Sequence, residues 1–289
     1  MSALKIQNTL NEIERKMTEL APYRPPELFN EFLVQGYTAI TLSSVSADDF
    51  HELLRAKLCM GTLITLYDDY ADRPSQSDPQ LLEILYQLNF GRTDTTTKCF
   101  YLTNRNVLSF ASSLFKEMNS VLDKLPHYNH LIEIVSFDLT QFYSANRYSS
   151  LVTANPHLGS QLENRSYAHH NMGMIIVSMM DLMASKNLRE SELGSIREVF
   201  LMSQRMGRIF NVLSTHERET NDGDVTGELA NCRTEHEREG TERSLREEIL
   251  NLKDKIASYE NRITTFSVSA YLNGLVKVQR LHEKMEGTI

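Results

Sequence analysis

Apolar residues recur three and four positions apart along almost the whole chain, which is typical of amphipathic α-helices. No segment alternates cleanly between apolar and polar residues, as a half-buried strand would. The 289 residues are 41% apolar and include no glycine- or proline-rich linker. We therefore predict an all-α, single-domain helical bundle over residues 1–289. The periodicity predicts helices over residues 6–19, 27–36, 81–89, 103–122, 130–151, 160–184, 189–219, 235–260 and 263–285.

One further helix is predicted between residues 46–49 and a run of aspartates near residue 70. Either Ser46 or Asp48 can accept hydrogen bonds from the first free N–H groups of that helix. The double proline in Tyr23-Arg24-Pro25-Pro26 ends the first helix, and residues 74–79 form a loop. The polar, turn-rich residues 220–227 have a composition suited to a mobile lid.

The formal net charge of −8 argues against nucleic acid as a partner, because phosphate backbones are bound by clustered Lys and Arg. The N-terminal residues 1–23 are charged and amphipathic, unlike a signal peptide. The longest apolar stretch, residues 172–184, is too short to span a membrane. The odd number of widely spaced cysteines, Cys59, Cys99 and Cys232, indicates reduced thiols and lacks zinc-ligand spacing. These features predict a soluble, cytoplasmic protein.

The highly charged residues 235–260 carry a thin apolar stripe at helical spacing, formed by Leu245, Ile249, Leu252 and Ile256. Such a stripe is compatible with a coiled-coil partner surface, and it is also what an outer helix of a bundle shows. We favour the outer helix, and a homodimer stays open as the assembly.

The first group of candidate functional residues is the DDxxD sequence at Asp68, Asp69 and Asp72, at the end of an apolar helix. Residues four apart lie on one face of a helix, so Asp68 and Asp72 stack with Asp69 beside them. An acidic run at a helix end is by itself a weak signal, because such runs are often solvated caps.

The second group is the NxxxTxxxE sequence at Asn211, Thr215 and Glu219, whose members line up over two helical turns. Carboxylate, amide and hydroxyl oxygens are the hard ligands that Mg²⁺ takes, usually together with substrate phosphates. If these two groups of oxygen ligands face each other, they would hold Mg²⁺ and, through it, a diphosphate.

In this order, and in a chain that reads helical throughout, the two motifs resemble those of the class I terpene synthases. The resemblance implies a helical bundle around a central apolar cavity, a cluster of three Mg²⁺ ions as cofactor and a prenyl diphosphate substrate. It implies that Arg218, directly before Glu219, contacts the diphosphate. The spacing found in the family places the diphosphate-sensing arginine at Arg165.

The chain also departs from the family pattern. Where other members carry Asp or Thr after the sensing arginine, this chain has Ala168 and His169. The family's C-terminal Arg-Tyr pair is missing, and Arg280 or Lys277 could substitute for it. Family members break the sensor helix a few residues later so that a main-chain carbonyl faces the cavity. Gly173, or the stretch around His169 and Asn171, could form that break.

Aromatic rings that face a cavity can stabilise a carbocation by cation–π attraction, although core packing explains any single ring equally well. Five methionines between Met172 and Met183 could form a soft pocket wall or fill the core. His169 and His170 could accept a proton or serve as structural hydrogen-bonding groups. The candidate pocket residues are Tyr67, Phe137, Phe142, His169, Gly173, Phe210 and Tyr271.

The function that follows from the resemblance is Mg²⁺-dependent ionisation of a prenyl diphosphate, with cyclisation or quenching of the carbocation and release of diphosphate. The compact layout resembles that of bacterial diterpene synthases, which implies a slight preference for C20 over C15 substrates. Because the chain has no DxDD sequence, initiation by protonation of an alkene is not expected. Two alternatives remain. A trans-prenyltransferase would need a second DDxxD where this chain has NxxxTxxxE, and a non-catalytic helical scaffold would leave both motifs unexplained.

Overall fold

The computed structural model describes residues 2–73, 75–89, 104–222, 226–230, 232 and 234–285. Cys99, the predicted helix start at Thr103 and the middle of the predicted lid, residues 223–225, lie outside the described residues. Cys59 and Cys232 are free cysteines.

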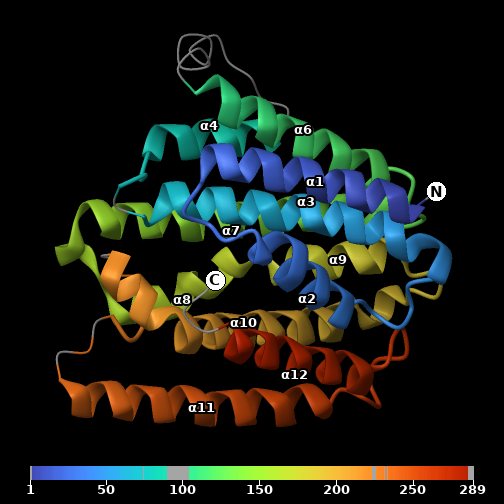
Figure 1. Cartoon of the computed structure of the whole chain (residues 1–289). Coiled ribbons are helices and arrows are strands. Elements are labelled where there is room, and N and C mark those ends of the chain that lie inside the picture. Colours follow the sequence, from blue (N-terminus) through green and yellow to red (C-terminus); the bar gives the residue numbers. More distant parts are fainter. Residues whose placement is uncertain are drawn as a thin grey trace.

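The described residues form helices and no strand, which confirms the predicted all-α class (Figure 1). The bundle is built around α3, which packs against α1, α6, α7 and α9. None of the described helices is both long and apolar enough to cross a membrane. Their bounds are α1 Ser2–Leu20, α2 Val34–Ala39, α3 Ala47–Ala71, α4 Pro79–Asn89, α6 Arg105–Leu122, α7 Tyr128–Ala154, α8 Gln161–Tyr167, α9 Met174–Ala184, α10 Leu193–Asp222, α11 Glu235–Ala257 and α12 Val268–Lys284.

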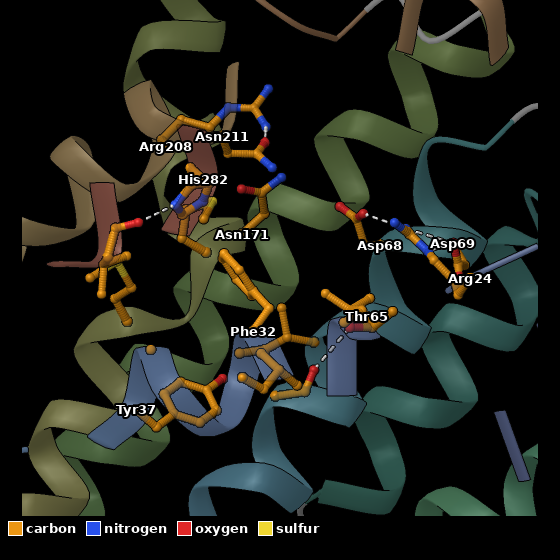
Figure 2. Close-up of a pocket in the computed structure, with 18 of the residues that line it drawn as sticks. Arg24, Phe32, Tyr37, Thr65, Asp68, Asp69, Asn171, Arg208, Asn211 and His282 are labelled. Carbon is orange, nitrogen blue, oxygen red and sulfur yellow. Dashed lines mark hydrogen bonds and ion pairs between the residues drawn. The ribbon is translucent and has the colours of Figure 1, made fainter. Parts of the chain in front are cut away.

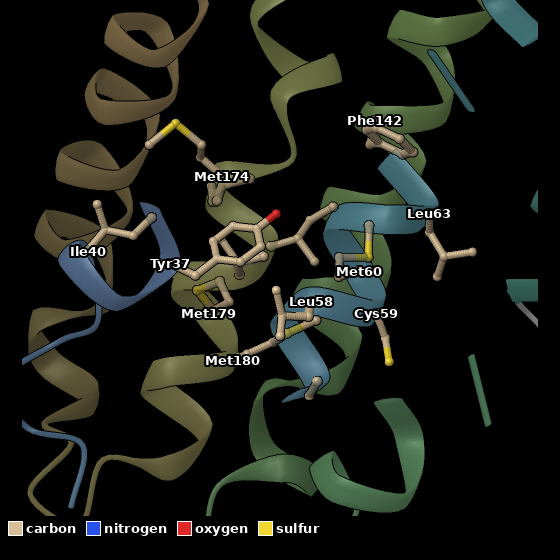
Figure 3. Close-up of a cluster of buried hydrophobic side chains, with 14 of the residues drawn as sticks. Tyr37, Ile40, Leu58, Cys59, Met60, Leu63, Phe142, Met174, Met179 and Met180 are labelled. Carbon is tan, nitrogen blue, oxygen red and sulfur yellow. The ribbon is translucent and has the colours of Figure 1, made fainter. Parts of the chain in front are cut away.

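Helix α3 is the central element because it is buried on nearly every side from Leu53 to Leu66. Its N-cap is Ser46, whose hydroxyl accepts a hydrogen bond from the Asp49 N–H at 3.2 Å. This settles the choice between Ser46 and Asp48. Methionines of α9 and residues of α2 pack against α3 in the core shown in Figure 3.

A buried ion pair joins α3 to α9. Lys57 Nζ lies 2.5 Å from Asp181 Oδ1, and the two side chains are 1% and 0% exposed. Lys57 also donates to Thr41 Oγ1 at 3.0 Å, and the Leu42 N–H donates to Asp181 Oδ2 at 3.2 Å. Burial lowers the pKa of Lys57 and raises that of Asp181, and the attraction between them opposes both shifts. The pair therefore fixes the chain after α2 to both helices.

The predicted helix over residues 160–184 is not continuous. Helix α8 ends at Tyr167, a 3₁₀ turn (η3, Ala168–Met172) follows, and α9 begins after Gly173. Gly173 has φ of 59°, and a Cβ there would lie 2.3 Å from Ile64 Cδ1, so glycine is required for conformation and for space. In the first turn of α9, the Ile175 N–H donates to a side chain of another helix, Gln204 Oε1 of α10, at 3.1 Å. The break expected near Gly173 is thus confirmed, and the single long helix is wrong.

The segment predicted as one helix over residues 27–36 has two parts. A π-helical turn (η1, Leu28–Leu33) leads directly into α2. Helix α1 ends at Leu20, before the double proline, as predicted, and the connection that follows brings Arg24 to the end of α3. This position becomes important for the candidate site.

Helix α11 is the outer helix that the charge pattern favoured. It packs against α10 and α12, and only Leu245, Ile249 and Ile256 of its residues are buried. The opposite face carries the charged residues and one exposed leucine, Leu250.

The Lys57–Asp181 pair gives the first prediction. The Lys57→Met variant should lower the free energy of unfolding by ~3–5 kcal/mol in urea titrations, because a buried carboxylate loses its counter-charge. Adding Asp181→Asn should recover part of the loss. The control Lys5→Met removes an exposed partner of Glu52 and should cost less than ~1 kcal/mol. Equal losses in the two lysine variants would contradict a structural role for the buried pair.

Candidate functional site

One cavity, with a volume of about 180 Å³, opens between the C-terminal end of α3 and the middle of α10 (Figure 2). Its wall also includes residues of η1, α2, η3 and α12. One part of the wall is charged, and the rest is mostly apolar. This division suits a ligand with an anionic head and a hydrocarbon tail.

The DDxxD carboxylates form one side of the charged part. Asp68, Asp69 and Asp72 all line the cavity. Asp69 is 2% exposed, whereas the Asp68 side chain is 36% exposed. Asp72 occupies the C-cap of α3, where its N–H donates to the Asp68 carbonyl at 3.1 Å.

An arginine that the sequence pattern did not identify neutralises this group. Arg24 donates from Nε to Asp69 Oδ1 at 3.0 Å and from Nη2 to Asp68 Oδ2 at 3.1 Å (Figure 2). Burial acts to lower the pKa of Arg24, but the two carboxylates outweigh it and raise that pKa. Burial also raises the pKa of Asp69, and Arg24 opposes the rise. In the sequence, the one feature that distinguishes Arg24 is that it directly precedes the double proline at positions 25 and 26.

The NxxxTxxxE residues lie on α10 across the cavity. Asn211 and Glu219 line it. Thr215 is fully buried behind them, with its hydroxyl 2.6 Å from Glu219 Oε1 and 2.7 Å from the Asn211 carbonyl oxygen. Thr215 therefore orients Glu219 in this structure and does not face the cavity.

Two arginines of α10 add positive charge to the wall. Arg218, the predicted diphosphate contact, lines the cavity, and its Nη2 lies 3.8 Å from Glu219 Oε1. Arg208, which belongs to neither motif, is 4% exposed and donates from Nη1 to Asn211 Oδ1 at 3.2 Å. It lies about one helical turn before Asn211, on the same face, which periodicity alone could have indicated.

Arg165 lies elsewhere. Its side chain is exposed on α8, where it lines surface grooves beside α11 together with Glu248. The hydrogen bond from Arg205 lowers the pKa of Glu248, and the nearby charge of Arg165 adds a smaller effect in the same direction. The structure therefore does not bring Arg165 to the cavity. Arg280 and Lys277, the suggested replacements for the Arg-Tyr pair, are exposed and do not line it either.

The seven candidate pocket residues also lie away from the cavity wall. Tyr67 and Phe142 pack on each other in the core at 5.2 Å between ring centroids. Tyr271 is buried and pairs with Ser178 at 3.1 Å. Phe137 is 57% exposed, because α7 turns that face outward, so it is not a pocket residue in this structure.

The remaining three candidates lie around the helix break and on α10. His169 is half-buried outside the cavity, and its ring lies 4.1 Å from that of His170 with the two planes tilted by 37°. Gly173 packs against Ile64, and Phe210 is buried behind the wall. The aromatic candidates were predicted because their helices carry a motif or pack beside one, and that criterion could not tell the core from the cavity wall. The apolar wall is formed by Leu28, Phe32, Leu33, Tyr37, Ile40, Ile64, Met172, Met174 and Val278.

The helix break supplies a polar group to the cavity. Asn171 lies in η3, is 5% exposed and lines the cavity. Its Oδ1 is buried and accepts no hydrogen bond. An unsatisfied buried acceptor costs free energy, so a ligand or an ordered water that donates to it would be stabilised here.

The oxygen atoms at the cavity are of the kind that binds Mg²⁺, but two of the carboxylates are paired with Arg24. Asp69 Oδ2 is buried without a hydrogen-bond partner, and Asp68, Asp72, Asn211 and Glu219 share its cavity. Among the residues described, no three His, Cys, Asp or Glu side chains converge as they would around one ion. Arg24 now occupies the carboxylates of Asp68 and Asp69, so a cation at these oxygens must compete with it.

No protein-family model matches the chain, and no curated protein matches its sequence. Among solved structures, the fold is similar to that of isoprene synthase from grey poplar leaves (Populus x canescens), with a TM-score of 0.65 and 12% identity. The match covers 96% of this chain and 52% of that protein, so the chain spans about half the length of its structural relative. The likeness shows a terpene synthase-like, isoprenoid synthase fold.

Competition between Arg24 and a metal ion gives the second prediction. The Arg24→Gln variant should melt at a lower temperature than wild type in EDTA, because Asp68 and Asp69 then repel each other without a counter-charge. Mg²⁺ should raise its melting temperature more than that of wild type and bind ~10-fold tighter, or ~1.4 kcal/mol. Calorimetry and thermal melts measure both effects.

Arg15→Gln is the matched control, because Arg15 forms an exposed pair with Glu19. It should leave both the melting temperature in EDTA and the response to Mg²⁺ at wild-type values. An identical Mg²⁺ response in Arg24→Gln and wild type would show that Arg24 does not compete with the metal.

Proposed function

We propose that this protein is a Mg²⁺-dependent terpene synthase, a lyase that ionises a prenyl diphosphate and releases diphosphate and a hydrocarbon or alcohol. The observation that supports it best is the union of both motifs at one cavity. Asp68, Asp69 and Asp72 on α3 face Asn211 and Glu219 on α10 at the charged part of a largely apolar cavity. The terpene synthase-like fold agrees with this function.

The cationic residues fit the first chemical step. Ionisation breaks the C–O bond, and negative charge develops on the diphosphate oxygens. Arg208 and Arg218 line the cavity and can donate hydrogen bonds to these oxygens, and guanidinium groups match phosphate geometry. Mg²⁺, held by the carboxylate and amide oxygens, would supply further charge neutralisation of the leaving group.

The apolar part of the cavity wall suits the carbocation that ionisation leaves behind. A carbocation reacts with water, so the hydrocarbon end of the cavity must exclude it. Phe32 and Tyr37 place rings in this wall, and a ring face attracts positive charge by ~0.5–2 kcal/mol. Met172 and Met174 complete a deformable apolar surface.

A trans-prenyltransferase is the second candidate, because it uses the same diphosphate chemistry. The residues on α10 argue against it, since Asn211 and Glu219 stand where a second DDxxD would be expected. A scaffold protein would not need buried, unsatisfied acceptors such as Asp69 Oδ2 and Asn171 Oδ1 in a cavity.

The third prediction tests the proposed activity. Wild-type protein with Mg²⁺ and geranyl, farnesyl or geranylgeranyl diphosphate should yield a terpene in a hexane extract analysed by gas chromatography. We expect the highest kcat/KM with the C20 diphosphate. The variants Asp68→Asn and Glu219→Gln should each lower kcat/KM by ~100-fold or more, because charge stabilisation of the leaving group is lost.

Asp123→Asn is the matched control, because Asp123 is an exposed carboxylate at the end of α6. It should keep wild-type activity. A longer prenyl diphosphate as product would favour the transferase, and inert substrates would favour the scaffold. Full activity in excess EDTA would exclude the Mg²⁺ mechanism. A preference for the C15 over the C20 diphosphate of ~10-fold, or ~1.4 kcal/mol, would reverse the expected chain length.

A further inference from the structure

The cavity wall includes an imidazole that neither motif accounts for. His282 lies near the end of α12, is 4% exposed and lines the cavity (Figure 2). The Phe32 ring packs edge-on against it at 4.8 Å, and the Phe210 ring lies at 5.9 Å. These contacts hold the ring between η1 and α10. Lys284, two residues later, pairs with Glu31 at 2.5 Å and ties the same end of α12 to η1.

The backbone fixes the tautomer of this ring. His282 Nδ1 lies 2.9 Å from the Val278 carbonyl oxygen, one turn earlier in α12. A carbonyl oxygen can only accept, so Nδ1 must carry the proton. In the neutral ring Nε2 then has a free lone pair, on the other side of the imidazole from Nδ1.

The surroundings keep the ring neutral. Burial lowers the pKa of His282 to about 4, against smaller opposing effects of the Val278 carbonyl and Glu283. At neutral pH the ring is therefore a proton acceptor with an oriented lone pair. A neutral Nε2 cannot donate to diphosphate, which separates the role of His282 from that of Arg208 and Arg218.

We propose that His282 Nε2 removes the proton that terminates the carbocation reaction, so that the main product is an alkene. This inference rests on the proposed function. After the C–O bond breaks, its electron pair leaves with the diphosphate. A C–H bond next to the cationic carbon then breaks, and its electron pair forms the new C=C bond. The proton joins the Nε2 lone pair and returns to diphosphate or solvent when the products leave.

Several other candidate acceptors are less suitable. The carboxylates of Asp68 and Asp69 are paired with Arg24. Burial raises the pKa of Tyr37, so its hydroxyl keeps its proton. His169, the acceptor considered from the sequence, lies outside the cavity. Among the described residues that line the cavity, His282 is the one imidazole.

The test compares the products of wild type, His282→Asn and His282→Gln. The Asn side chain can keep the hydrogen bond to the Val278 carbonyl while it removes the acceptor at Nε2. We expect diphosphate release to stay within about threefold of wild type, because ionisation does not use His282. The alkene share of the product should fall about 10-fold or more, with alcohols in its place. His236→Asn, on the exposed part of α11, is the matched control and should keep the wild-type product profile.

Each outcome is decisive. An unchanged alkene share in the variants would overturn the role of His282 while leaving the proposed function intact. A wild-type protein without turnover would overturn the proposed function itself. Nitrogen-15 NMR of the His282 ring in the wild-type protein tests the tautomer even if the variants do not fold. Protonation at Nε2 at neutral pH would overturn the inference.

Discussion

The structure depends on one constraint, which is that a helix buried on nearly every side also carries charged residues that must be neutralised. Helix α3 contains Lys57 in its core-facing part and three aspartates at its end. Transfer of an unpaired charge into a protein interior costs several kcal/mol, so each of these groups needs a partner at a fixed place. Lys57 has Asp181 on α9, and Asp69 has Arg24 in the connection before η1. These pairings set how α9 and the N-terminal segment lie against α3.

The same requirement explains why the cavity is divided. The charged groups gather where α3 ends, because there the Asp68 side chain still reaches solvent and arginines can approach. Deeper in the bundle, Gly61 leaves space for Tyr37, since a Cβ at Gly61 would lie 2.4 Å from the Tyr37 hydroxyl oxygen. The wall there is aromatic and aliphatic. The chain thus places a charged region of the cavity wall beside an apolar one, and His282 lies in the same wall.

The helical periodicity was enough to predict the fold class and most helix positions, because each helix buries an apolar face against α3 or its neighbours. The structure places Asp68 and Asn211, one from each motif, in the wall of one cavity. The spacing of apolar residues did not predict the structure correctly where a helix is irregular. It did not predict the π-helical turn over residues 28–33, which presents Phe32 to the cavity. Phe142 and Phe32 are equally apolar in sequence, and only the packing of distant helices decides which ring meets the cavity.

The position of Arg165 shows the same limit for a residue predicted to be functional. Counting residues back from Asn211 predicts where the Arg165 side chain points only if the chain between them forms regular helix. Here that chain includes a 3₁₀ turn and a glycine in the left-handed conformation. Helix α8 consequently presents Arg165 to the acidic groups near α11. Arg24 reaches the aspartates from the connection between α1 and η1, and Arg208 lies within a turn of Asn211. Electrostatic compensation within the folded structure therefore identifies arginines at the cavity that counting along the sequence cannot.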